Sequence, residues 1–129
     1  MPERPVLIVD DSQDTREMLQ IWLEASGFRV VLAEGGAEAV GKALTFRPQV
    51  VLMDIGLPQM DGLEATRLIK GNSETVDTVI ICLTGMAEPQ RREAALAAGC
   101  AQVLIKPCSL PDVLAAVQKA YKSEPEATV

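Results

Sequence analysis

The chain has 129 residues, of which 48% are hydrophobic, and its 12 basic and 18 acidic residues give a net charge of −6. This length suits one folded domain, and the hydrophobic content is too high for a disordered chain. The negative charge argues against direct contact with nucleic acid or a membrane, and without a bilayer-length apolar stretch or a signal-peptide pattern we expect a cytoplasmic protein.

Five short apolar runs recur along the chain, each followed by a longer segment with the period of a helix. The runs are rich in β-branched residues and are nearly unbroken by polar ones, as in strands of a parallel sheet that is covered on both faces. The predicted strands are 6–9, 30–32, 50–53, 79–83 and 103–105.

Helix start and stop signals lie between these runs. The predicted helices begin after a cap at Asp11 or Ser12, at about residue 36, near Asp61, at Glu88-Pro89 and after a cap at Ser109. The first and fourth stop at Gly27 and Gly99. In the second helix, which we expect to end at about residue 46, Val40 and Leu44 share one apolar face.

Strict alternation of strands and helices predicts an α/β fold with right-handed crossovers. We expect a doubly wound (βα)5, flavodoxin-like three-layer sandwich, in which a parallel five-stranded sheet has the strand order 2-1-3-4-5. Residues 1–122 are predicted to form this domain. Residues 123–129 look like a flexible tail or a linker.

The sequence contains no histidine and three cysteines, Cys82, Cys100 and Cys108. Without histidine, Ser-His-Asp and Cys-His nucleophiles are excluded, and the cysteine spacing does not match a zinc motif. Each cysteine lies within or beside an apolar segment. We therefore interpret all three as reduced residues of the core or near the surface.

Polar residues end four of the five predicted strands. Asp10 and Asp11 follow the first, Asp54 the third, Thr84 the fourth and Lys106 the fifth. Ligands of open α/β sheets bind at the carboxyl ends of the strands, where the strand order reverses. With the order 2-1-3-4-5, the three aspartates would surround one crevice, and the threonine and the lysine would lie along its rim.

Each of these residues also has an ordinary structural interpretation. Asp11 can cap a helix, Asp10 and Asp54 can form turns, and Lys106 can be a solvated charge. Independent turns, however, give no reason for the acids and the lysine to share one edge. Three carboxylates in one crevice repel one another unless a cation lies between them, and an all-oxygen ligand set favours Mg²⁺.

Four sequence motifs carry a resemblance to the receiver domains of two-component response regulators. The resemblance extends from Pro5 to Tyr121, and its motifs are Val9-Asp10-Asp11, residues 53–62, Leu83-Thr84-Gly85 and residues 99–107. It implies that Asp54 is the phosphoacceptor. Mg²⁺ would be bound by Asp11, by Asp54 and by the main-chain carbonyl of Gly56, with Asp10 helping directly or through water.

The resemblance gives the remaining site residues and the partners as well. Lys106 and Thr84 would each hold a phosphoryl oxygen, and the peptide bond before Pro107 is commonly cis in this family. The phosphoryl donor would be a histidine kinase or a histidine phosphotransfer protein, and the output partner is not specified. Such a domain is not an enzyme acting on other substrates, although it assists its own phosphorylation and dephosphorylation.

One residue departs from the family pattern, and two positions bear on the lifetime of the phosphoryl group. Val103 stands three residues before the lysine, where the family usually has an aromatic switch residue. We therefore expect the output to run through the loop after Thr84 and through the fourth helix. Gly56 and Met86 flank the site, and the glycine is expected to leave the phosphoryl group accessible to water.

Three other functions are weaker alternatives. An aspartyl-phosphate phosphatase of the haloacid dehalogenase type needs a second acid two residues after its nucleophile, and Gly56 stands there. A flavodoxin-like flavin carrier needs a first loop that donates hydrogen bonds to phosphate, which Asp10 and Asp11 would repel. A receiver that serves only as a phosphate-independent docking surface is the remaining alternative.

Overall fold

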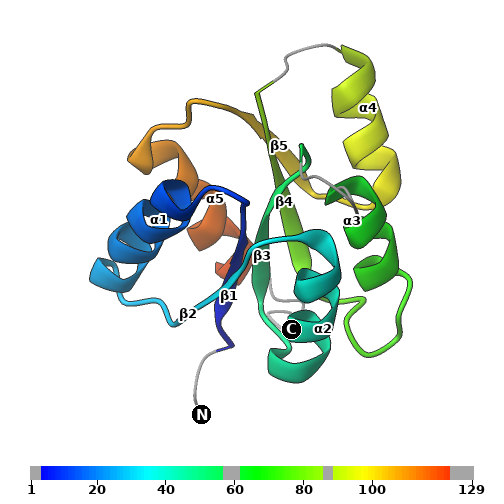
Figure 1. Ribbon diagram of the computed structural model, residues 1–129, viewed down its shortest axis with the longest axis horizontal. Helices are drawn as coiled ribbons and strands as arrows, with labels where there is room; N and C mark the ends of the chain where they lie inside the picture. Colours follow the sequence, from blue (N-terminus) through cyan, green and yellow to red (C-terminus); the bar gives the residue numbers. More distant parts are fainter. Residues whose placement is uncertain (1–3, 57–61, 86–88, 123–129) are drawn as a thin grey trace.

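The computed structural model describes residues 4–56, 62–85 and 89–122, and its five strands form one parallel sheet in the order β2-β1-β3-β4-β5 (Figure 1). This order and the parallel pairing confirm the predicted topology. The strands are β1 (Val6–Val9), β2 (Val30–Ala33), β3 (Val50–Asp54), β4 (Val79–Thr84) and β5 (Gln102–Ile105).

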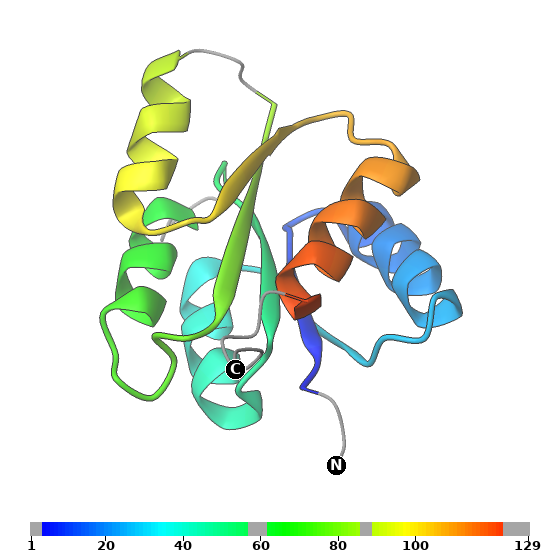
Figure 2. The same cartoon turned by 180° about the vertical axis from the view of Figure 1, so that it is seen from behind.

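Five helices cover the sheet on both faces, which confirms the three-layer sandwich. Helices α1 and α5 lie on one face, and α2, α3 and α4 lie on the other, as the two opposite views show (Figures 1 and 2). The helices are α1 (Gln13–Ala25), α2 (Gly36–Phe46), α3 (Gly62–Lys70), α4 (Pro89–Ala98) and α5 (Leu110–Lys122).

Alternate side chains of each central strand enter opposite halves of the core. In β1, Val6 and Ile8 pack with residues of α1 and α5, whereas Leu7 and Val9 pack with residues of α2, α3 and α4. All residues of β1 and β3 are buried. This two-sided burial is the physical reason for the unbroken apolar runs in the sequence.

The helix ends agree with the predicted signals. Ser12 rather than Asp11 caps α1, since its side chain accepts a hydrogen bond of 3.3 Å from the amide of Thr15. Ser109 accepts a hydrogen bond of 3.2 Å from the amide of Asp112 at the start of α5. The stop residues Gly27 and Gly99 both have positive φ. Asp61 and Glu88, at the predicted starts of two helices, lie outside the described residues.

The buried face of α2 is made of smaller residues than Val40 and Leu44. Ala39 and Ala43 are fully buried, Val40 is only partly buried, and Leu44 is 38% exposed. The buried face of α2 is thus shifted by one residue from the predicted face, onto the two alanines. Their small side chains let the helix backbone lie close to the sheet.

Two of the three cysteines are core residues. Cys82 and Cys100 are buried free thiols, and Cys108 is half-buried, in agreement with the interpretation from sequence. Among the described residues, no helix is both long and apolar enough to cross a membrane. The predicted tail, residues 123–129, lies outside the described part of the chain.

Candidate functional site

The site begins where β1 passes directly into α1. The amide of Asp10 continues the sheet by donating to the carbonyl of Ala33 at 3.2 Å. Its carboxylate Oδ1 accepts a hydrogen bond of 2.9 Å from the amide of Ser12, the cap of α1. This short turn leaves Asp10 buried at 1% exposure, whereas the next residue, Asp11, is exposed.

The second half of the site lies at the end of β3. Asp54 is the last residue of this strand and is 7% exposed. Its Oδ1 accepts a hydrogen bond of 2.9 Å from the amide of Gly56, and the amide of Ile55 donates to Leu83 of β4 at 3.1 Å. The strand exit thus fixes the Asp54 carboxylate beside the end of β1.

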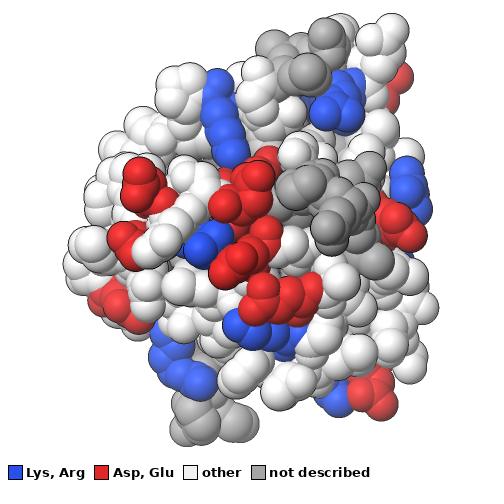
Figure 3. All heavy atoms as spheres, viewed as in Figure 1, with Lys and Arg blue, Asp and Glu red and all other residues white. Residues whose placement is uncertain are grey.

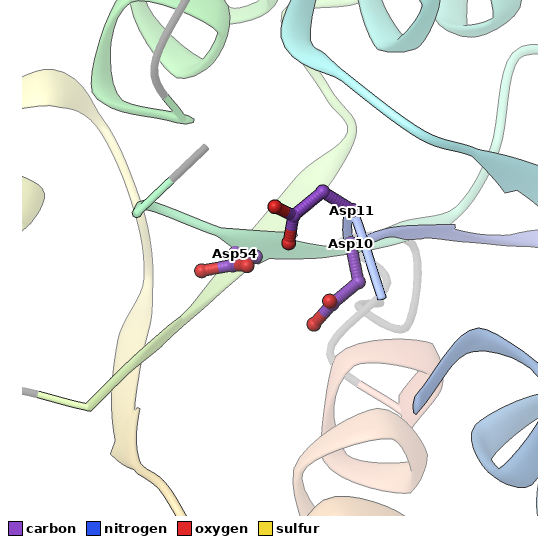
Figure 4. A group of neighbouring side chains, drawn as sticks. All are labelled: Asp10, Asp11 and Asp54. Carbon is purple, nitrogen blue, oxygen red and sulfur yellow. The ribbon is translucent and has the colours of Figure 1, made fainter. Parts of the chain in front are cut away.

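The predicted convergence of the three acids is confirmed. Asp10, Asp11 and Asp54 each offer a carboxylate oxygen, and these atoms all lie within 4.8 Å of one another (Figure 4). In the view of Figure 3, acidic side chains run together down the middle of the molecule, with basic side chains to their left and below them. Oxygen ligands at this spacing repel one another strongly and suit a hard divalent cation.

Lys106 reaches the same carboxylates from the end of β5. Its Nζ lies 3.0 Å from Oδ2 of Asp10 and 3.5 Å from Oδ2 of Asp54. Burial alone would lower the pKa of Lys106, but the hydrogen bond to Asp10 and the charges of Asp54 and Asp10 outweigh it, and the pKa is raised. The ammonium group therefore stays charged and neutralises part of the acidic cluster.

Thr84 lies on the same edge of the sheet, at the end of β4. It is 3% exposed, and it follows Leu83, the register partner of Asp54. Its carbonyl accepts a hydrogen bond of 2.7 Å from the amide of Lys106, which links the ends of β4 and β5. The peptide bond between Lys106 and Pro107 is cis, as the resemblance implies.

The start of α3 lies against the backbone of the candidate phosphoacceptor. A Cβ atom on Gly62 would come within 2.4 Å of the Asp54 carbonyl oxygen and 2.6 Å of the Ile55 Cα. Real Cβ atoms do not approach backbone atoms this closely, so a side chain at this position would push α3 away from β3. The glycine that ends the 53–62 motif therefore has a structural role at the site.

Gly56, which flanks the site, and Val103, which departs from the family pattern, take defined positions. A Cβ atom on Gly56 would be 3.6 Å from Asp54 Oδ1, an ordinary contact, so the glycine leaves room for a side chain beside this carboxylate. Val103 is 7% exposed and belongs to the core on the side of α2, α3 and α4. Residues 57–61 and Met86, the other flanking position, lie outside the described residues.

Sequence reasoning missed one basic residue at the site. Arg16 of α1 donates a hydrogen bond of 2.7 Å to the main-chain carbonyl of Asp10, and its side chain is only 11% exposed. Its position six residues after Asp10 was the available signal, because that spacing brings the residue back over the end of β1. The long side chain gives many other possible contacts, so spacing alone could not select this one.

Comparisons with known proteins agree with this geometry. Residues 6–118 match the response regulator receiver domain family. The chain is 33% identical over 108 residues to the polar-differentiation response regulator DivK of Brucella anthropi, a match that covers 84% of this chain and 88% of DivK. It is 37% identical over 115 residues to the response regulator MprA of a Mycobacterium species, covering 89% of this chain but only 49% of MprA.

A solved structure supports the same relationship. The receiver domain of the sensor histidine kinase PA1611 from Pseudomonas aeruginosa, which has a magnesium ion coordinated in its active-site cleft, superposes with a TM-score of 0.86. The two are 31% identical, and the match covers 94% of this chain and 99% of the other. The acidic cluster at the sheet edge, the strand order and these matches together show that the chain belongs to the response regulator receiver domain family of two-component signalling.

Proposed function

We propose that this chain accepts a phosphoryl group on Asp54, with Mg²⁺, from a phosphohistidine of a histidine kinase or a histidine phosphotransfer protein. The observation that carries the proposal is the position of Asp54, within 4.8 Å of the carboxylates of Asp10 and Asp11 and 3.5 Å from the ammonium of Lys106. An isolated strand-end aspartate would have neither the partner acids nor the cation.

The residues present fit a magnesium ion. The three carboxylates lie close enough to share one ion, and two of them are buried. One lysine does not balance their charge, and their oxygen atoms are hard ligands of the kind that Mg²⁺ prefers. Asp10, Asp11 and Asp54 would hold the ion together with the main-chain carbonyl of Gly56. When bound, Mg²⁺ supplies positive charge for the oxygens of the transferred phosphoryl group.

The protein's own contribution to transfer is positioning. The Gly56 amide holds Oδ1 of Asp54, which fixes the carboxylate that attacks phosphorus. As the new P–O bond forms, the P–N bond to the donor imidazole breaks, and its electron pair leaves with the imidazole nitrogen. Lys106 then pairs with one phosphoryl oxygen, and the Thr84 hydroxyl donates to another.

The same site assists the loss of the phosphoryl group. Water attacks the phosphorus of the acyl phosphate, and Asp54 is regenerated as inorganic phosphate leaves. The space that Gly56 leaves beside Asp54 admits that water. The domain thus assists both its phosphorylation and its dephosphorylation without acting on another substrate.

We propose that the conformational change caused by phosphorylation spreads from Thr84 to residues 85–98, which include α4. We expect the Thr84 hydroxyl to move toward the phosphoryl oxygen that it binds, and Val103 is too short to cover the space that it leaves as an aromatic ring would. Backbone NMR spectra with and without beryllofluoride test this route. Shift changes concentrated in residues 85–98 are expected, and spectra in which these residues do not respond would contradict it.

The primary test is intact-protein mass spectrometry after incubation with acetyl phosphate and Mg²⁺. A phosphate adduct is expected on the wild type, and none on Asp54→Ala or in EDTA. A wild type that takes up no phosphate under these conditions would instead favour the phosphate-independent docking receiver. The chain spans about half the length of MprA.

A further inference from the structure

Arg16 lies about one turn inside α1 and touches two strand exits. Its Nη1 donates a hydrogen bond of 2.7 Å to the carbonyl of Asp10, and its Nη2 lies 3.8 Å from Oε2 of Glu34, which follows β2. With its side chain 11% exposed, the guanidinium makes the first of these contacts largely out of water. A charge-assisted hydrogen bond in such a place is stronger than an ordinary one.

The Asp10 carbonyl belongs to the peptide group that joins Asp10 to Asp11. An uncompensated change in the ψ angle of Asp10 or the φ angle of Asp11, the two angles on either side of this peptide group, would turn the two carboxylates away from each other. The Asp10 side chain is held by the Ser12 amide and by Lys106, and the ring closed by the Ser12 hydrogen bond includes this peptide group and restrains it through the side chain. The hydrogen bond from Arg16 holds the carbonyl oxygen of the same peptide group directly.

We propose that Arg16 is a positioning residue of the metal site, which holds the Asp10–Asp11 peptide so that both carboxylates converge with Asp54 before Mg²⁺ binds. This inference rests on the proposed Mg²⁺ site, because it assigns Arg16 the task of holding two of its ligands. Outer contacts that orient metal ligands contribute substantially to metal affinity in other proteins.

The charge of Arg16 and its hydrogen bond act on Mg²⁺ binding in opposite directions. By charge alone, removal of a cation near three carboxylates would tighten the binding of a dication. Glu34 and Glu38 already balance part of this charge. The pKa of Glu38 is lowered, first by the hydrogen bond from the Glu34 amide, then by Lys42, with Arg16 as a smaller Coulombic cause. We therefore expect the hydrogen bond to dominate.

The test is calorimetric titration of the unphosphorylated chain with MgCl₂, for wild type, Arg16→Met and Arg16→Lys. Exchange of the Ser12 amide hydrogen, followed by NMR, is a second readout that needs no phosphorylation. Arg4→Met is the matched control. Arg4 donates to the carbonyls of Arg47 and Pro48 at 2.8 and 3.0 Å, ahead of β1 and hence at the opposite end of the strands.

Arg16→Met is expected to raise the Kd for Mg²⁺ by about tenfold and to speed exchange of the Ser12 amide. Arg16→Lys should recover part of the affinity, and Arg4→Met should lower stability without changing the Kd. Equal or tighter Mg²⁺ binding by Arg16→Met would overturn the inference while leaving the proposed function intact. Should Arg16→Met not fold, Arg16→Gln serves the same comparison, and a wild type that binds no Mg²⁺ would overturn the proposed function itself.

Discussion

The ammonium group of Lys106 donates a hydrogen bond of 3.0 Å to the carboxylate of Asp10, a residue 96 positions earlier in the chain. The Asp10 side chain is 2% exposed, and that of Lys106 is 31% exposed. A nearly buried carboxylate thus depends on a cation that remains in partial contact with water. This arrangement ties the two outermost parts of the site, the exits of β1 and β5, to each other.

Replacement of Lys106 by methionine should destabilise the protein in EDTA. Asp10 would lose its ion pair while remaining buried, and we expect a loss of about 1–3 kcal/mol in the free energy of unfolding, discounted for the exposure of the lysine. Urea denaturation measures this loss. Millimolar Mg²⁺ should reduce it, because the dication replaces the missing charge.

The pH dependence of that difference has a defined sign. The pKa of Lys106 is raised above its ordinary value of 10.5, so its contribution is fully present below that value and is lost only as the pH rises through the higher folded-state pKa. The difference between wild type and variant should therefore be constant between pH 7 and pH 9. Lys119→Met, which removes the same charge from an exposed position on α5, should change stability by less than about 0.5 kcal/mol.

Asp11→Asn should stabilise the metal-free protein while weakening Mg²⁺ binding. Asp11 adds an exposed negative charge within 4.8 Å of two other carboxylates, so its neutralisation relieves repulsion. We expect a gain of up to about 1 kcal/mol at low salt, measured by urea denaturation in EDTA and shrinking as salt is added. Glu93→Gln on α4 removes an equal charge outside the cluster, and a gain of the same size there would contradict the explanation.

Gly62→Ala should destabilise the protein and slow its phosphorylation. The added methyl group would lie 2.4 Å from the Asp54 carbonyl oxygen, so α3 or the end of β3 must move, at a cost of about 1–3 kcal/mol. Gly41→Ala in α2 is the matched control, since nothing lies within 4 Å of a Cβ atom there. That change should stabilise the helix by about 0.5–1 kcal/mol. Equal effects of the two substitutions would show that the close approach at Gly62 has no energetic consequence.

Cys108 and Cys82 should react with iodoacetamide at separable rates. Cys108 is half-buried and should be labelled first in the native protein, although burial raises its pKa. The pKa of Cys82 is raised, first by its hydrogen bond with Cys100 and then by burial, so its thiol stays protonated. Peptide mass spectrometry should therefore find Cys82 labelled only as fast as the protein unfolds. Native labelling of Cys82 at the rate of Cys108 would contradict this packing.

Local pattern accounts for the elements, their order and most of the site. Apolar β-branched runs favour strands covered on both sides, and the residues after Val9, Met53 and Leu83 are expected at one edge because parallel strands end together. The topology then brought Asp10, Asp11, Asp54 and Lys106 to one place, as the measured distances confirm. Thr84 was placed on that edge by the same reasoning.

Other contacts could not be predicted from the sequence pattern, because they depend on how closely the helices and strands approach one another. The bond from Arg16 to the Asp10 carbonyl, the close passage of Gly62 over Asp54 and the alanine face of α2 all depend on distances of a few ångströms between separate elements. Hydrophobic periodicity fixes which side of a helix is buried to within about one residue, but not its distance from the sheet. That distance follows from the packing of all the side chains at once, so it emerges only in the folded chain.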